Sequence, residues 1–362
     1  MNPLRFSSLS IRNLRNLAHV DLALAPRLTV IGGANGQGKT SILEAMYLVA
    51  TTRSFRTSRL REVVAHDSSA GSVKATVDDG VEEREQVVGL DGSTRRVLLS
   101  GKRPPSLASY AVKSPVVVFH PGETTLSSGP ASHRRTLLDR IALFVDPTSM
   151  DHQARFTSAC RARQKTLQVR GTQASELEAF EKLIAHHGVA LSQARREAAR
   201  RLIQHVLPAF ARITRQERDI DLRYEPGGPE DDAQLEEALR SHRERDLHRG
   251  SPSRGPHRDD LAIEIGGFGA RTDASQGEHR AITLALKLAE LACIAEARGV
   301  YPVLLLDDVS SELDPERTSS FFETLLETPG QIVLTTTRPE LIRTPGLDER
   351  ADYSIHRGNI AT

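Results

Sequence analysis

The sequence has few cysteines and no long hydrophobic segment. Its two cysteines, Cys160 and Cys293, form no CxxC pair and no metal-ligand spacing, and one pair so far apart does not make a disulfide framework. No run of about 18 or more apolar residues is present to span a bilayer, and the N-terminus, MNPLRFSSLSIRNL, lacks the apolar centre of a signal peptide. These absences exclude a disulfide-stapled secreted domain and predict a cytoplasmic protein without a membrane partner.

The sequence also lacks a large net charge, but the charge is unevenly distributed. The formal net charge is +1, so the chain as a whole carries no bias towards nucleic acid or membrane. Residues 152–215 contain 12 Arg and Lys against 4 Glu and no Asp, a local charge of +8 that leaves −7 for the remainder. This block predicts a basic face, and an ordinary solvated helix face remains the plainer explanation.

The order of apolar patterns predicts two domains. With 362 residues the chain can bury a sizeable core and divide in two. Strand patterns in the first 120 residues and again after residue 300 indicate an α/β fold with a mixed sheet. Residues 130–249 read as mostly helical, and apolar positions between 177 and 202 step by three and four, as in two short packed helices. We expect a discontinuous α/β domain, residues 1–120 and 250–362, and a helical, partly basic lobe without a long coiled coil, residues 121–249.

The stretch VIGGANGQGKTS, residues 30–41, predicts a phosphate-binding loop. Gly33, Gly38, Lys39 and Thr40 fit GxxxxGK[ST], and the match follows an apolar strand and opens a helix. Backbone N–H groups of such a loop close around phosphates, the lysine reaches the β- and γ-phosphates, and the threonine hydroxyl binds Mg²⁺. The predicted nucleotide contacts are Gly33, Asn35, Gly36, Gly38, Lys39, Thr40 and Ser41.

Two carboxylates at the end of a buried strand complete this predicted site. Four apolar residues, VLLL, lead into Asp307, and Asp308 follows directly. Adjacent carboxylates at a strand end are costly unless they meet a cation or take part in proton transfer. We predict that Asp307 and Thr40 hold Mg²⁺, and that Asp308 polarises the attacking water beside the catalytic Lys39.

The segment ASQGEHR, residues 274–280, has two interpretations. Ser275 and Glu278 match the S-x-x-E capping box that commonly begins a helix. The same hydroxyl, with Gly277 and the N–H groups of the first helical turn, also suits a phosphate. Both can hold at once, so the sequence leaves them open.

Together these motifs resemble the ABC-type ATPase heads, in which a signature segment of one subunit completes the nucleotide site of another. TRSFRT at 52–57, FHPGE at 119–123, GPASHRRTLLD at 129–139 and RGPHRDDL at 254–261 further resemble the RecF family, in family order over nearly the full length. The resemblance implies a weak ATPase whose homodimer, bridged by ATP, binds double-stranded DNA near gaps or junctions. With RecO and RecR it would promote RecA loading on single strands in recombinational repair.

The resemblance also implies roles for individual residues. Ser275, Gln276 and Gly277 would meet the γ-phosphate across the dimer, and Glu312 and Asp314 fall in the loop that couples the two sites. The arginine-rich stretches become candidate DNA contacts, with plain loop or surface charges as the alternative. These candidates are Arg53, Arg56, Arg161, Arg163 and Lys165.

The sequence departs from the usual pattern in four places. It has SQGE where a transporter-type signature reads LSGGQ, and it has no glutamine between residues 87 and 152 for the lid loop. The switch histidine is absent where QIVLTTT ends, with Thr337 in its place, and Asp308 stands where glutamate is more usual. Because aspartate reaches less far than glutamate, we expect slow hydrolysis, which suits a switch better than a motor.

Two other functions remain open. A nucleotide-binding subunit of an ABC transporter would explain the ATPase motifs but not the basic helical block or RGPHRDDL. A P-loop kinase of a small molecule, with Arg53 and Arg56 as lid residues, would leave the SSELD extension after Asp308 without a purpose.

Overall fold

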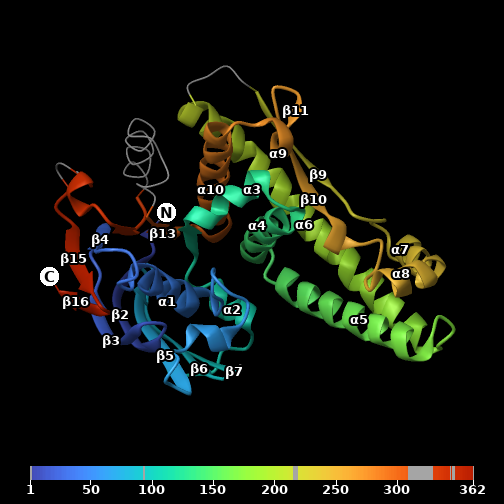
Figure 1. The fold of residues 1–362 in the computed structure, drawn as a ribbon, viewed down its shortest axis with the longest axis horizontal. Helices are drawn as coiled ribbons and strands as arrows, with labels where there is room; N and C mark the ends of the chain where they lie inside the picture. The colour runs from blue at the N-terminus through green and yellow to red at the C-terminus, as the bar shows by residue number, and fades with distance from the viewer. Residues whose placement is uncertain are drawn as a thin grey trace. The chain divides into compact units, whose positions relative to one another are not determined.

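The computed structural model describes residues 2–92, 94–214, 219–308, 329–342, 344 and 347–361. The chain divides into two compact units (Figure 1). Unit 1 comprises Met1–Glu123 and Ile294–Thr362, and unit 2 comprises Thr124–Cys293. Among the described residues, every helix is too short or too polar to cross a bilayer.

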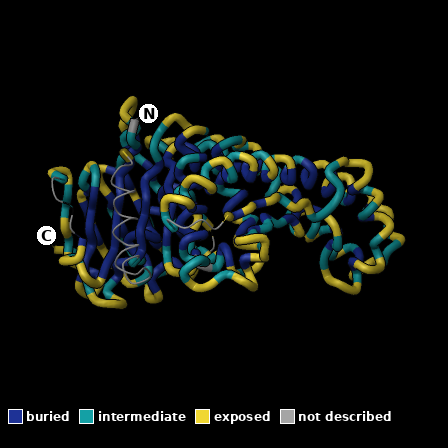
Figure 2. Tube along the Cα trace, turned by 90° about the horizontal axis from the view of Figure 1, so that it is seen from above, coloured by how far each residue is buried: buried dark blue, intermediate teal, exposed yellow. Residues whose placement is uncertain are grey.

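The six-stranded sheet of unit 1 joins the two ends of the chain. Its strands run in the order β16-β15-β4-β14-β13-β8, parallel except for the β15–β16 pair. The four strands β4, β14, β13 and β8 are buried along their whole length, as parallel strands covered on both faces are. Figure 2 shows buried strands of this kind in dark blue. The bounds are β4 Leu28–Gly32, β8 Val116–Phe119, β13 Val303–Asp307, β14 Ile332–Thr336, β15 Arg350–His356 and β16 Asn359–Ala361.

A second, antiparallel sheet completes unit 1. Its order is β3-β2-β5-β6-β7, and alternate residues of its strands are buried, which gives it one core face and one exposed face. α1 (Lys39–Thr51) packs against strands of both sheets, and its residues from Ile42 to Ala50 are all buried. The further elements of unit 1 are β1 Asn2–Pro3, β2 Arg5–Leu14, β3 Leu17–Ala23, η1 Leu60–Val63, β5 Ala70–Asp78, β6 Glu83–Asp91, β7 Thr94–Leu99, α2 Leu107–Ala111, η2 Pro121–Thr124, β12 Val300–Tyr301 and η5 Pro339–Leu341.

Unit 2 combines helices with a three-stranded antiparallel sheet of order β11-β10-β9. The long helix α6 (Glu176–Thr214) packs against α5 (Ser149–Arg170) at one end of the unit. Towards its other end α6 shares a core with α4, the sheet and α10. The remaining bounds are α3 Thr125–Ser128, α4 Ala131–Val145, β9 Ile220–Glu225, α7 Asp232–Ser241, α8 Arg243–Arg249, η3 Pro256–Arg258, β10 Asp260–Ile265, β11 Phe268–Gly269, α9 Ala270–Asp273 and α10 Gln276–Arg298.

The fold class agrees with the sequence prediction, while the second unit extends beyond the expected residues 121–249. β10 pairs with β9 along its full length, so the chain after residue 249 belongs to the same sheet as the chain before it. The apolar face of α10 is buried with Ala198 and Leu202 of α6. The apolar positions from 177 to 202 lie on one continuous helix, α6, whose packing partner is α5.

Candidate nucleotide-binding site

The predicted phosphate loop connects β4 to α1. Gly36 and Gly38 have φ values of 79° and 118°, a region that glycine enters without strain. A Cβ on Gly33 would stand 2.7 Å from the carbonyl oxygen of Ile355, and one on Gly38 would stand 2.8 Å from a methyl of Leu17. Close packing therefore requires glycine at both ends of the loop, and a loop of this kind can direct backbone N–H groups at a phosphate.

Lys39 begins α1 and turns back across the loop. Its ammonium donates to the carbonyl oxygens of Gly33, at 2.7 Å, and Ala34, at 3.0 Å. Burial lowers the pKa of Lys39, while the carboxylates of Asp308 and Asp307 act in the opposite direction. A partly desolvated ammonium at a helix N-terminus is well suited to a phosphate group.

Thr40 and the two predicted carboxylates meet at the end of β13. The Thr40 hydroxyl lies 2.8 and 2.9 Å from the two oxygens of Asp307, and Thr335 donates to the same carboxylate at 2.8 Å. Asp308 adopts a left-handed conformation, φ 48°, and its N–H donates to the Thr335 carbonyl at 3.1 Å. This turn directs Asp307 and Asp308 differently from one strand end, which permits the two roles predicted for them.

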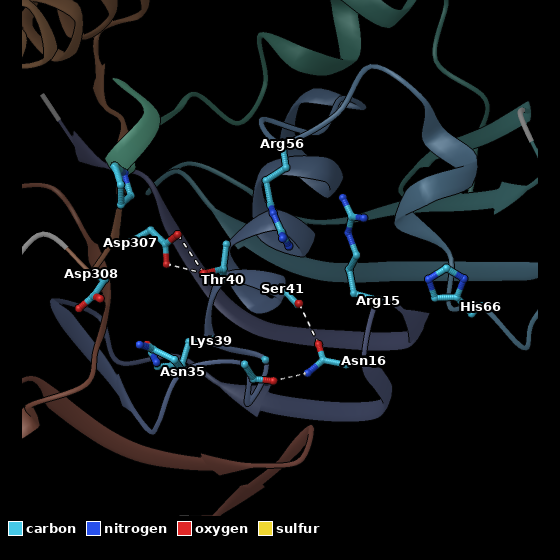
Figure 3. Close-up of a pocket in the computed structure, with 13 residues that line it drawn as sticks. Arg15, Asn16, Asn35, Lys39, Thr40, Ser41, Arg56, His66, Asp307 and Asp308 are labelled. Atoms are coloured by element: carbon cyan, nitrogen blue, oxygen red, sulfur yellow. Dashed lines mark hydrogen bonds between the residues drawn. The ribbon is translucent and has the colours of Figure 1, made fainter. Parts of the chain in front are cut away.

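These groups line one pocket of about 540 Å³ (Figure 3). Thirteen residues form its wall, and in Figure 3 Asp307 and Asp308 lie across it from Arg15 and Arg56. Every predicted nucleotide contact except Gly33 is among them, and the Gly33 carbonyl accepts a hydrogen bond from the ammonium of Lys39. The wall comprises Arg15, Asn16, Asn35, Gly36, Gly38, Lys39, Thr40, Ser41, Arg56, His66, Pro121, Asp307 and Asp308.

Sequence reasoning did not find Arg15, Asn16, His66 and Pro121. Asn16 lies in the turn between β2 and β3, where its amide donates to the Gly36 carbonyl at 3.2 Å and accepts from the Ser41 hydroxyl at 2.9 Å. This turn has only two residues, Arg15 and Asn16, and carries no spacing that predicts contact with a loop twenty positions later. What sets this turn apart is its backbone conformation, which the sequence does not reveal, because Arg15 has a φ of 52°.

Glu44 connects two of the arginines in the pocket wall. Its carboxylate, 1% exposed, accepts from Arg15 at 2.8 and 2.9 Å and from Arg56 at 3.2 Å. Ser54 donates to the same carboxylate at 2.5 Å. Arg56, predicted to contact DNA, thus lies at the nucleotide pocket.

The pocket also includes part of the FHPGE segment. Pro121 lies in the pocket wall, and the His120 ring stacks on Phe55 with a centroid distance of 5.1 Å. This stack joins FHPGE to the segment that carries Arg56.

The predicted signature segment lies in unit 2, at the start of α10. The Ser275 N–H donates to the Glu278 carboxylate at 2.7 Å, and the Glu278 N–H lies 3.3 Å from the Ser275 hydroxyl. The capping-box interpretation is therefore correct, and Ser275 and Gln276 are exposed. Glu312 and Asp314 lie outside the described residues.

The remaining DNA candidates differ sharply in exposure. Arg53, Arg161 and Lys165 are exposed. Arg163 is wholly buried, and its guanidinium donates to Glu181 at 3.0 Å and to Asp246 at 2.8 Å. The prediction for Arg163 is wrong, because a fully enclosed side chain that already binds two carboxylates offers no surface to a duplex.

A magnesium ion fits the donor set of this pocket. The Thr40 hydroxyl and the Asp307 carboxylate supply hard oxygen ligands, and Mg²⁺ usually adds water and substrate phosphates to one or two such groups. Within the described ranges, no group of three or more His, Cys, Asp or Glu is arranged to hold a metal ion by itself. Phosphate oxygens would therefore be required to complete the coordination shell.

Comparison with known proteins gives one consistent answer. Residues 5–351 match the family model of the RecF/RecN/SMC N-terminal domain. The DNA replication and repair protein RecF of Myxococcus xanthus (strain DK1622) is 35% identical, with 99% of this chain and 97% of the relative covered. The RecF protein of Anaeromyxobacter sp. (strain Fw109-5) is 36% identical, with 99% of both chains covered.

Solved structures agree with this result. A structure of the recombination mediator protein RecF with ATP, described as part of the RecFOR pathway, has a TM-score of 0.87 at 26% identity, covering 99% of this chain and 98% of that one. An Smc head domain from Pyrococcus furiosus shares the fold, with a TM-score of 0.55 at 15% identity and coverage of 99% and 95%. From its relatives and its fold, the chain belongs to the RecF family.

Proposed function

We propose that the chain is an ATP-dependent DNA-binding protein of recombinational repair and a weak ATPase. The observation that supports this most directly is the convergence of Lys39, Thr40, Asp307 and Asp308 on one pocket from two distant parts of the chain. The similar RecF structure described with ATP supports ATP as the nucleotide. The relatives favour this function over the transporter subunit and the small-molecule kinase that the sequence left open.

Each residue has a defined role in this proposal. Lys39 and the loop N–H groups bind the phosphates, and Thr40 and Asp307 hold Mg²⁺, which when bound supplies neutralising charge to the β- and γ-phosphates. Asp308 orients and polarises the attacking water. Its short side chain and constrained backbone favour slow turnover, so hydrolysis acts as a timed release.

The proposed switch also requires a second copy of the chain. Ser275 directly precedes the 23-residue helix α10, which Gln276 and Gly277 begin, and the N-terminus of this helix favours an anionic group. We propose that these residues meet the γ-phosphate bound by the partner, so that ATP closes a homodimer. The closed dimer then binds double-stranded DNA near gaps or junctions in the cytoplasm, and acts with RecO and RecR to place RecA on single strands.

Duplex binding measured by fluorescence anisotropy tests the switch. The wild type is compared with Ser275→Arg, with and without ATP and Mg²⁺. Ser132→Arg is the matched control, because it adds the same charge to the first turn of another helix of unit 2, α4, at an exposed position. We expect tight, ATP-dependent binding in the wild type and in Ser132→Arg, and its loss in Ser275→Arg.

Sedimentation of an Asp308→Asn variant tests the dimer separately. With hydrolysis blocked, ATP and Mg²⁺ should convert the monomer into a stable dimer. Monomers alone under these conditions would rule out the ATP-bridged mechanism. In the anisotropy experiment, duplex binding that depends neither on ATP nor on Ser275 would show that DNA binding is not coupled to nucleotide binding.

A further inference from the structure

Four arginines of unit 2 form an exposed group around α8. Arg245 and Arg249 belong to α8, and Arg254 and Arg258 belong to the loop that follows it, within SRGPHRDD. We refer to these four residues as the α8 arginine cluster. All four are exposed, and none forms an ion pair with a carboxylate among the residues that the structure describes.

The arginines just before the cluster do have acidic partners. Arg240, just before α8, pairs with Glu236 at 3.0 Å. Arg243, in the first turn of α8, pairs with Glu181. The same short stretch of chain therefore contains neutralised arginines and, directly after them, arginines that keep their full charge.

The cluster also holds like charges close together. Arg245 and Arg249 are four positions apart on α8, where side chains are neighbours and like charges destabilise a helix by a few tenths of a kcal/mol. The pKa of Arg258 is lowered, first by partial burial and then by the charge of Arg249, which places these two guanidinium groups in the same electrostatic environment. Binding of an anion would reduce the electrostatic repulsion between these guanidinium groups.

The backbone that carries the cluster is firmly held. The buried carboxylate of Asp246, on the inner side of α8, accepts from the Ser253 N–H at 2.8 Å and so ties the loop to the helix. The Gly255 N–H donates to the Gly227 carbonyl at 3.2 Å. A Cβ on Gly227 would stand 2.4 Å from the Cβ of Arg258, so the loop packs directly on the 227 backbone. A fixed loop reduces the entropy lost when its arginines bind a ligand.

His257 anchors the loop from the other side. Its ring stacks on Phe156 of α5 at a centroid distance of 6.0 Å, and its Nε2 lies 2.6 Å from the Pro252 carbonyl. In SRGPHRDD the histidine is thus turned inward while Arg254 and Arg258, on either side of it, are exposed. In this segment His257 anchors the loop, and Arg254 and Arg258 lie at the surface.

We propose that the α8 arginine cluster binds the phosphodiester backbone of nucleic acid. Guanidinium groups form paired hydrogen bonds with phosphate oxygens, and four unneutralised arginines on a fixed scaffold match a repeating anion. None of the large exposed hydrophobic side chains among the described residues comes from α8 or its loop, whereas a protein interface normally has an apolar core. This inference rests on the proposed DNA-binding function and specifies one surface for it.

The test compares two double variants of the full-length protein. Arg249→Gln with Arg258→Gln removes two charges from the cluster. Arg223→Gln with Arg240→Gln removes two exposed charges of the same unit that are already paired with Glu225 and Glu236. Duplex affinity is measured by anisotropy with ATP and Mg²⁺ between about 50 and 200 mM salt. Thermal unfolding and binding of a fluorescent ATP analogue verify that both variants are folded and bind nucleotide.

For the cluster variant we expect roughly tenfold to one hundredfold weaker duplex binding, and a logarithmic salt slope that is shallower by about 2, since each lost phosphate contact removes about 0.9. The control variant should remain close to the wild type. Wild-type affinity and slope in the cluster variant, or an equal loss in both variants, would overturn the inference and leave the proposed function intact. A wild type that binds no duplex would instead refute the proposed function.

Discussion

The hydroxyl of Thr40 contacts both carboxylate oxygens of Asp307, although 267 positions separate these residues in the chain. The contact exists because β13 and β4 both pair with β14, which brings two strand ends to the same edge of the sheet. Thr335, at the end of β14 itself, donates to the same carboxylate. The phosphate loop and the acidic strand end are therefore one structural unit.

Replacing Asp307 with Asn should separate nucleotide binding from metal binding. The amide keeps the shape and retains one acceptor for Thr40, but it lacks the charge that attracts Mg²⁺. Changes to the groups that support a metal site typically reduce metal affinity by about 10- to 100-fold, so the Mg²⁺-dependent gain in ATP affinity should fall by roughly that factor. Titration of a fluorescent ATP analogue with and without Mg²⁺ measures this gain.

Asp308→Asn is the matched control for that change. It alters the neighbouring carboxylate, so nucleotide affinity should persist while turnover is lost. If Asp307→Asn kept the full Mg²⁺-dependent gain, Asp307 would have no part in holding the metal.

Glu44→Gln should alter nucleotide affinity through the arginines that Glu44 positions. Arg15 is held by two hydrogen bonds, and Arg56 by one longer bond, so loss of the charge mainly releases Arg56. We expect a several-fold change in ATP affinity. We also expect a loss of stability of about 1–3 kcal/mol, because one buried acceptor becomes a donor facing guanidinium groups.

A double-mutant cycle with Arg56→Ala shows whether this effect is local. If Glu44 acts through Arg56, Glu44→Gln should change affinity much less when Arg56 is already absent. Glu290→Gln is a stability control, since Glu290 is an equally buried carboxylate that binds Arg140 in unit 2. An equal affinity change in the Glu290 variant would show that lost stability alone explains the result.

The position of the GxxxxGK[ST] loop between a strand and a helix was predictable because its signals lie in contiguous residues. Lys39 and Thr40 need their positions beside Gly38, and a buried apolar run before Asp307 defines a strand end. Each of these signals is local, and the parallel sheet then brings them together. The capping box of Ser275 and Glu278 was also predictable, because its two residues lie three positions apart in the sequence.

The residues that sequence reasoning missed or misplaced depend on distant contacts. Asn16 reaches the loop only because the β2–β3 turn packs on it, and Arg56 reaches the pocket because Glu44 holds it there. Arg163 was predicted to be a basic surface residue from the local net charge of its segment. Net charge does not show that its side chain points inward to Glu181. The expected end of the second domain at residue 249 differs from the observed one because the pairing of β10 with β9 cannot be recognised from the local sequence.

Arg163→Met should destabilise the protein strongly. The long apolar side chain fills much of the space, but Asp246 then remains buried without its cation, while Glu181 keeps Arg243. Breaking a buried ion pair by removing one partner costs about 3–5 kcal/mol, and we expect a value near the lower end. Denaturant unfolding measures the change, and Arg161→Met, an exposed position on the same helix, should stay within about 0.5 kcal/mol of the wild type.

Glu290 should make part of the stability of the protein dependent on pH. Burial alone would raise the pKa of Glu290, but the charges and hydrogen bonds of Arg140 and Lys287 outweigh it and lower the pKa. A carboxylate with a depressed pKa contributes stability that is fully present above its unfolded value, about 4.3, and is lost as the pH falls through the folded value. Glu290→Gln removes this ionisation and should cost about 3 kcal/mol at neutral pH.

The difference in unfolding free energy between wild type and Glu290→Gln should therefore be constant from about pH 7 to pH 5 and should narrow below about pH 4. Denaturant titrations across this range give both curves. Glu197→Gln is the control, because its partly exposed carboxylate pairs with exposed Arg200 and half-buried Arg201, and an ion pair in such a solvent-accessible position contributes at most about 1 kcal/mol. If the difference in unfolding free energy stayed constant down to the pH of acid unfolding, the Glu290 carboxylate would not be stabilised in its charged form by Arg140 and Lys287.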